Sequence, residues 1–178
     1  MGLFDLQNPT NKNNLSRLEE LYLKYSFKNS DITIGKQLLN SSFINLQDGR
    51  MRPTEVNGIW LDFNEIKKTK VNVGYLYGIS PRSTLKYVKV GESIGLYPTG
   101  LNPDGTKSGY YGNLDSDGIY IVGIQNESVK NLKALLWNQY AENLFNSALF
   151  QMDYKYDLNA NSKILLGFQT IYQSAVNF

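Results

Sequence analysis

The 178-residue chain contains neither cysteine nor histidine. Disulfide frameworks, zinc sites and catalysis by Cys or His side chains are therefore excluded together. Carboxylates remain, but Asp48, Glu55, Asp62 and Glu92 show no spacing typical of a catalytic acid–base pair. We expect no catalytic residue, no metal ion and no cofactor, and hence no enzyme.

An excess of charge of one sign is also lacking, as are long apolar runs. The 18 Lys and Arg against 16 Asp and Glu leave a net charge of +2 without blocks of like charge, so we expect no nucleic-acid partner. No run approaches the roughly 18 apolar residues of a membrane-spanning helix. A transmembrane β-barrel is still compatible with this sequence, because its strands alternate lipid-facing and lumen-facing side chains and look polar on average.

The residues that are abundant favour strands and turns. Aromatic residues make up 13% of the chain, with 13 Tyr and 2 Trp, and 15 Gly accompany only 5 Pro. Apolar and polar residues alternate with a period of two, most clearly on the two sides of a polar turn at 64–70. We expect the alternating apolar residues of this hairpin to share one outer face, with Gly74 and Gly78 facing inward; these apolar residues are Ile59, Leu61, Phe63, Val71, Val73 and Tyr75.

The same pattern predicts an all-β chain of about eight strands. Their approximate ranges are 18–27, 31–39, 56–64, 69–79, 117–125, 131–140, 145–156 and 162–173, with long loops at 40–55 and 80–116. Short turns near Lys28, Lys67, Glu127 and Asn159 join pairs of strands, and the long loops lie at the opposite end. Short turns at one end and long loops at the other are typical of an outer-membrane barrel.

Two segments also fit a helix. Ser16 and Glu19 match a capping box, and the apolar stripe that follows suits a helix, although we favour a strand there. Residues Leu132, Leu136 and Tyr140 fit a helical stripe as well as they fit a strand, so the pattern leaves 132–152 undecided.

An ordered set of short strings resembles OprD-type outer-membrane porins. The strings include Arg17 to Tyr25, Ile34 to Gln37, Asp48 to Pro53, Asn57 to Leu61, Ile79 to Arg82, Val90 to Ile94, Leu136 to Tyr140 and Tyr154 to Tyr156. The resemblance spans Arg17 to Phe178 and implies a transmembrane, antiparallel, up-and-down β-barrel. Residues 1–178 would form a partial barrel domain, about half of the roughly 16 to 18 strands of a barrel with an aqueous channel. The resemblance also makes 132–156 two strands that meet near 141–143.

By the same resemblance, the protein is a passive diffusion channel for small polar solutes in the outer membrane of a Gram-negative bacterium. Its partners would be outer-membrane lipid and small polar or anionic solutes, especially carboxylate-bearing ones such as amino acids. Met1 to Asp5 does not begin a secretory signal. We therefore expect the N-terminus to be internal to a longer natural chain or to result from a truncated reading frame.

The resemblance also assigns candidate channel residues. Arg50, Arg52 and Arg82 fall in the two long loops, where the constriction of the family would lie, and a guanidinium matches a carboxylate. Asp48 and Glu92 would supply the opposite wall. Lys24 and Lys36 would face the lumen, and a girdle at the membrane interface is expected from Tyr25, Tyr75, Tyr77, Tyr154 and Tyr156.

Three alternatives remain open. The arginines can be ordinary solvated loop charges. A soluble β-rich carbohydrate-binding module would use exposed Tyr and Trp to stack on sugar rings. A hydrolase based on carboxylates ranks lower, because no nucleophile or metal site is evident in the sequence.

Overall fold

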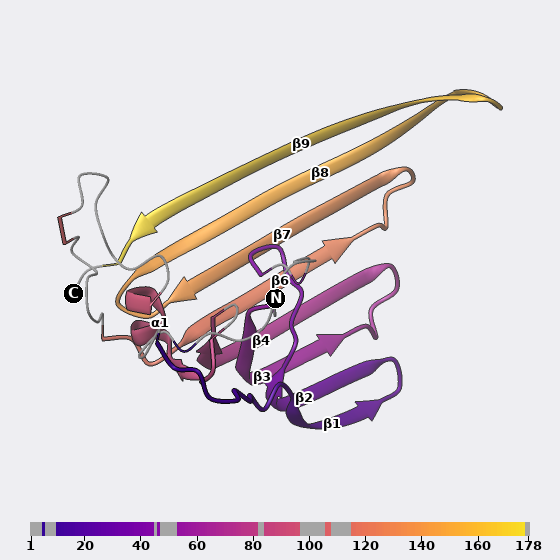
Figure 1. The fold of residues 1–178 in the computed structure, drawn as a ribbon. Coiled ribbons are helices and arrows are strands. Elements are labelled where there is room, and N and C mark those ends of the chain that lie inside the picture. The colour runs from indigo at the N-terminus through magenta and orange to yellow at the C-terminus, as the bar shows by residue number, and fades with distance from the viewer. Residues whose placement is uncertain are drawn as a thin grey trace.

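The structure is a computed structural model that describes residues 5, 10–44, 46, 53–81, 84–96, 106–107 and 115–176. Its strands form a single antiparallel sheet (Figure 1). The long strands are β1 (Leu21–Phe27), β2 (Ser30–Gln37), β3 (Glu55–Phe63), β4 (Thr69–Ser80), β6 (Ile119–Asn126), β7 (Leu132–Ala141), β8 (Phe145–Asn159) and β9 (Ser162–Ala175). Each pairs with the next long strand along the chain, which confirms the all-β antiparallel prediction.

The two ends of the sheet differ. At one end, which we call the turn end, short connections at 28–29, 64–68, 127–131 and 160–161 close four hairpins (Figure 1). At the other, the loop end, lie the connections 38–54 and 81–118 and a tight turn at 142–144. Lys28, Lys68, Asn131 and Asn143 have positive φ in four of these tight connections. The expected layout is therefore confirmed, and 132–156 consists of two strands that meet at 142–144 rather than a helix.

Cross-strand register defines two faces of the sheet. Tyr75, Tyr120 and Tyr140 are successive partners across β4, β6 and β7 and lie on the face that we call the tyrosine face. Trp60 and Trp137 lie on the opposite face, the tryptophan face, where they pair with Gly74 and Gly123. On the tyrosine face Ile59 pairs with Tyr75, Leu61 with Val73 and Phe63 with Val71, as expected for this hairpin.

A β-bulge near the loop end changes the face of later residues in β4. Gly58 pairs with Leu76 but Asn57 pairs with Gly78, so Tyr77 is an extra residue. Asn57 precedes Gly58 and therefore points to the other face, and a Cβ on Gly78 would lie 3.2 Å from the Asn57 Cβ. The prediction that Gly74 and Gly78 share a face is wrong for Gly78, because an inserted residue shifts the alternation.

The apolar core lies on the tryptophan face. Trp60, Leu76, Ile121, Trp137 and Leu149 come from the strands. Leu39 and Val90 join them from the two long connections, with Phe43 and Ile44 packed alongside. Part of each long connection therefore packs onto this face of the sheet.

The segment expected to be an irregular loop at 80–116 contains two further elements. A two-residue strand, β5 (Val88–Lys89), pairs with Gly78 and Ile79 of β4, and helix α1 (Val90–Leu96) follows. Two glycines give α1 a poor intrinsic helix propensity, so no helical pattern was evident. Packing of Val90, which is 1% exposed, and a 2.6 Å hydrogen bond from Ser93 Oγ to the Val90 carbonyl stabilise it.

Candidate functional site

Charged side chains of the long strands gather on the tryptophan face. Lys24 and Asp31 form a 3.0 Å ion pair there, and Lys133 pairs across the strands with Asp153. The register places the following charged residues on this face: Lys24, Asp31, Asp62, Lys70, Lys133, Asp153, Lys155, Asp157 and Lys163. This face is therefore the one that suits contact with water and polar solutes.

The tyrosine face is exposed and apolar. Its exposed side chains include Val73, Val122, Ile124 and Leu136 in the middle of the sheet. The rings of Tyr75 and Tyr120 are 4.7 Å apart and those of Tyr120 and Tyr140 are 6.2 Å apart. Within the long strands as described, its charged residues are Lys36 and Glu55, both near the loop end. The expected girdle tyrosines all project from this face. The register places Tyr25, Tyr75, Tyr154 and Tyr156 there, and the ring of the bulged Tyr77 lies 6.0 Å from that of Tyr75.

A small polar cavity lies on the tryptophan face of β1, β2 and β3. It has a volume of about 280 Å³, and Lys24, Trp60 and Asp62 line it together with Tyr22 and Gln37. Trp60 Nε1 donates a 2.9 Å hydrogen bond to Asp62 Oδ1, which also accepts one from Asn72 Nδ2. The cavity thus combines a fixed carboxylate, an ammonium group and aromatic rings.

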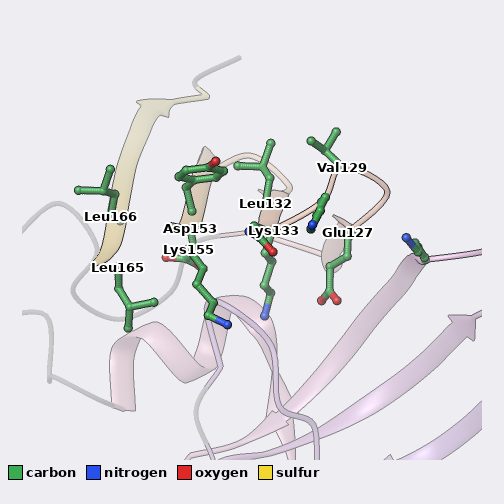
Figure 2. A pocket seen from close by; sticks show the side chains of 13 residues that line it. Glu127, Val129, Leu132, Lys133, Asp153, Lys155, Leu165 and Leu166 are labelled. Carbon is green, nitrogen blue, oxygen red and sulfur yellow. The ribbon is translucent and has the colours of Figure 1, made fainter. Parts of the chain in front are cut away.

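A larger open cavity, of about 860 Å³, lies at the turn end beside β7, β8 and β9. Figure 2 shows Lys133 and Lys155 extending to one side of the strands, whereas Leu132 and Val129 extend to the other. The separation of charged from apolar side chains therefore continues to this end of the sheet.

Of the five residues predicted to form a constriction, the structure describes only Glu92. Asp48, Arg50, Arg52 and Arg82 lie outside the described residues. Glu92 is exposed in the first turn of α1, and its Oε2 accepts a 3.4 Å hydrogen bond from the Lys89 amide.

Lys24 and Lys36, both predicted to face the lumen, lie on opposite faces. Lys24 pairs with Thr33, which pairs with Trp60 on the tryptophan face. Lys36 pairs with Asn57, and its ammonium group lies 4.7 Å from the centre of the Tyr87 ring. Because Lys36 is two residues from Ile34, plain alternation already places it with the apolar side chains.

Sequence reasoning missed the lysines at the turn end of the tryptophan face. Lys133 and Lys155 each stand between apolar or aromatic residues that point the other way, and Lys70 and Lys163 are each followed by one, Val71 and Ile164. This alternation is the signal that could have identified them.

Together, the two faces define a class of protein. A sheet with one face that is apolar and uncharged away from the loop end and one charged face, closed by short turns at one end, is the wall of an outer-membrane β-barrel. In the part of the chain that the structure describes, no helix is long and apolar enough to cross a membrane.

The chain belongs to the OprD family of outer membrane porins, whose family model matches residues 4–175. This membership confirms the resemblance, places the chain in the bacterial outer membrane, and agrees with the expectation of a porin rather than an enzyme. It also weighs against the soluble carbohydrate-binding module. A comparison with curated protein sequences gives no match.

Solved porin structures share the fold. OccD3 (OpdP) of Pseudomonas aeruginosa is 14% identical with a TM-score of 0.71, over 90% of this chain and 36% of that one. OccK8 (OprE) of the same organism is 16% identical with a TM-score of 0.69, over 86% and 36% of the two chains. OccAB1 of Acinetobacter baumannii is 18% identical with a TM-score of 0.67, over 86% and 32%. The chain thus covers about a third of these barrels.

Proposed function

We propose that the complete protein is a passive diffusion channel for small polar solutes, and that residues 1–178 supply part of its barrel with the tryptophan face lining the channel. The observation that carries this proposal is the distribution of charge across the sheet. Charged strand residues gather on the tryptophan face, and the middle of the tyrosine face has exposed Val73, Val122 and Leu136. A charge on the lipid side of a barrel costs roughly 2 to 4 kcal/mol at the bilayer midplane. An orientation with the tryptophan face toward lipid would therefore be very unfavourable.

Small carboxylate-bearing solutes, such as amino acids, are the proposed cargo. Arg50 and Arg52 belong to the β2–β3 connection, whose Leu39 packs onto the tryptophan face. Arg82 belongs to the β4–β6 connection, which reaches the tryptophan face at Val90. Guanidinium groups there would attract a carboxylate, while Asp48 and Glu92 would form the opposite wall of a transverse field. On the barrel wall, Lys24 would face the lumen and place a positive charge at the small polar cavity.

Liposome swelling with the complete protein tests whether it is a channel. Arabinose, glycine and glutamate are small polar probes of different charge, and each should enter the vesicles and make them swell. Vesicles that stay impermeable to all three solutes would contradict the proposed function.

Charge reversal tests the solute class. We expect Arg50→Glu/Arg52→Glu to slow the entry of glutamate and to shift the reversal potential of single channels toward cations. Local charge acts most strongly at a narrow, partly desolvated point. Lys130→Glu is the control, because Lys130 is exposed in the β6–β7 turn, where water and salt screen its charge. Equal small shifts for the pair and for Lys130 would show that the arginines are ordinary surface charges.

A further inference from the structure

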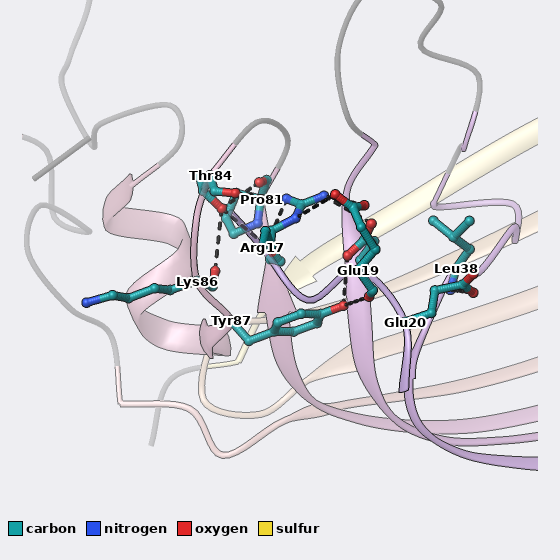
Figure 3. A network of polar contacts seen from close by, with 10 residues as sticks. Arg17, Glu19, Glu20, Leu38, Pro81, Thr84, Lys86 and Tyr87 are labelled. Carbon is teal, nitrogen blue, oxygen red and sulfur yellow. Dashed lines mark hydrogen bonds and ion pairs between the residues drawn. The ribbon is translucent and has the colours of Figure 1, made fainter. Parts of the chain in front are cut away.

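A buried polar network joins three separate parts of the chain at the loop end. Arg17, just before β1, uses all of its N–H donors (Figure 3). Its Nε and Nη2 donate to the Glu19 carboxylate at 3.3 and 3.0 Å, and Nη2 also donates to Glu55 Oε1 at 3.0 Å. Its Nη1 donates to Ser80 Oγ at 3.1 Å and to the Thr84 carbonyl at 3.0 Å. The side chains of Arg17 and Glu55 are each only 1% exposed.

Tyr87 completes this network from the β4–β6 connection. Its hydroxyl lies 2.6 Å from the Glu19 carbonyl oxygen and 2.8 Å from Glu55 Oε2, so its one proton is shared between two acceptors. Burial, and then the hydrogen bond to Glu55, raise the pKa of the Tyr87 hydroxyl. The hydroxyl therefore remains a donor under all physiological conditions.

The network lies on the tyrosine face, opposite the apolar core. Val56 belongs to the core and Ile79 packs against it, so their chain neighbours Glu55 and Ser80 point to the other face. The connection thus begins on the tyrosine face with Thr84 and Tyr87, which contact Arg17 and Glu55.

The next residues cross the edge of the sheet. Val88 and Lys89 form β5, which pairs with the part of β4 beyond the last β6 partner, Leu76. Val90 then enters the apolar core on the tryptophan face. Residues 84–90 therefore contact the loop end of the sheet in three places. They contact its tyrosine face, the edge of β4 and its tryptophan face.

We propose that Arg17, Glu55 and Tyr87 are positioning residues that, with Val90, form a rim clamp holding the start of the β4–β6 connection in one place. Helix α1 begins at the clamp, so the clamp fixes the position of the start of α1 at the loop end of the sheet. The effect of the clamp on ion current rests on the proposed function, because only a channel carries a current that a change at the loop end can alter.

Tyr87→Phe in the complete protein is the sharpest test. The change keeps the ring, its contact with Lys36 and every charge, and removes only the hydroxyl. Loss of this buried hydrogen bond should raise the released population of the clamp roughly fivefold. We expect more frequent current fluctuations in single channels, with an unchanged reversal potential and an unchanged melting temperature of the barrel. Glu55→Gln should act in the same direction, and Tyr77→Phe, an exposed tyrosine of the same face, should behave as wild type.

Amide hydrogen exchange of the membrane-inserted protein gives a second measurement that needs no current. Exchange at Val88 and Lys89 should accelerate in Tyr87→Phe and not in Tyr77→Phe. Wild-type fluctuations and wild-type exchange in Tyr87→Phe would overturn the clamp while leaving the channel intact. A protein that carries no current but shows the accelerated exchange would contradict the proposed function and support the clamp.

Discussion

Two glycines allow the tryptophans to lie flat on the sheet. A Cβ on Gly123 would lie 2.6 Å from a ring atom of Trp137, and one on Gly74 would lie 2.4 Å from a ring atom of Trp60. The two indoles stack with ring centres 6.3 Å apart and an interplanar angle of 15°. The glycines therefore determine how closely the core packs against the barrel wall.

We expect Gly123→Ala to destabilise the protein by about 1 to 3 kcal/mol, the usual cost of overpacking a core. The indole of Trp137 would have to move, because Gly123 lies directly beneath the ring. Gly167→Ala is the matched control in β9, where the nearest atom to an added Cβ is the Asp153 Oδ1 at 3.3 Å. Urea unfolding in lipid vesicles measures the difference, and equal effects of the two substitutions would contradict this account of Gly123.

At the residue scale, the sequence predicted the faces of some strand residues correctly and of others wrongly. Alternation correctly placed Ile59 and Tyr75 together, because no irregularity lies between them. It failed for Gly78, because the extra residue Tyr77 becomes visible only when β3 and β4 are aligned. The contact between Gly123 and Trp137 likewise depends on the register of two strands, which local sequence does not encode.

At the scale of elements, neighbouring turns at the turn end support one another. The Asn29 amide and Ser30 Oγ, from the β1–β2 hairpin, donate hydrogen bonds of 2.9 and 2.7 Å to Glu65 Oε1 in the β3–β4 connection. The hydrogen bond from Ser30, followed by that from Asn29, lowers the pKa of the Glu65 carboxyl below its ordinary value of 4.5.

This pKa shift predicts a dependence on pH. A carboxyl with a lowered pKa in the folded state contributes stability above its ordinary pKa and loses it as the pH falls through the folded value. We expect the protection factor of the Asn29 amide in hydrogen exchange to be constant above about pH 5 and to decrease below pH 4.5. In Glu65→Gln the protection should be lower and independent of pH, whereas the same acid-induced decrease in this variant would exclude Glu65 as its cause.

The ambiguity at 132–152 has a geometric origin. Leu132, Leu136 and Tyr140 are four residues apart, which keeps them on one face of a helix and also on one face of a strand, because four is a multiple of two. Pattern alone therefore could not decide, and the resemblance to porins correctly indicated two strands. The strand favoured over a helix at 18–27 is present as β1 at Leu21–Phe27, and Glu19 binds Arg17 instead of capping a helix.

At the scale of the whole molecule, the described sheet is open. β1 and β9 each pair with one neighbouring strand, and the sheet between them covers about a third of the solved porins. An open apolar sheet has unpaired backbone groups at both edges, which a closed barrel satisfies. The layout of turns and loops was predictable from the sequence because turn residues and alternation are local signals. The packing of Leu39 and Val90 onto the tryptophan face was not, because it depends on residues of the core that are far apart in the sequence.

The central claim is that the tyrosine face contacts lipid and the tryptophan face contacts water, and labelling of single cysteines tests it most directly. The chain contains no cysteine, so each introduced thiol is unique. In the complete protein in vesicles, thiols at Val73, Val122 and Leu136 should resist a charged, membrane-impermeant reagent and, once carrying a fluorophore, should be quenched by brominated lipids. Thiols at Asn72, Lys133 and Gln151 on the tryptophan face should react with the charged reagent and escape quenching. Equal labelling of both sets, or the opposite pattern, would contradict the account.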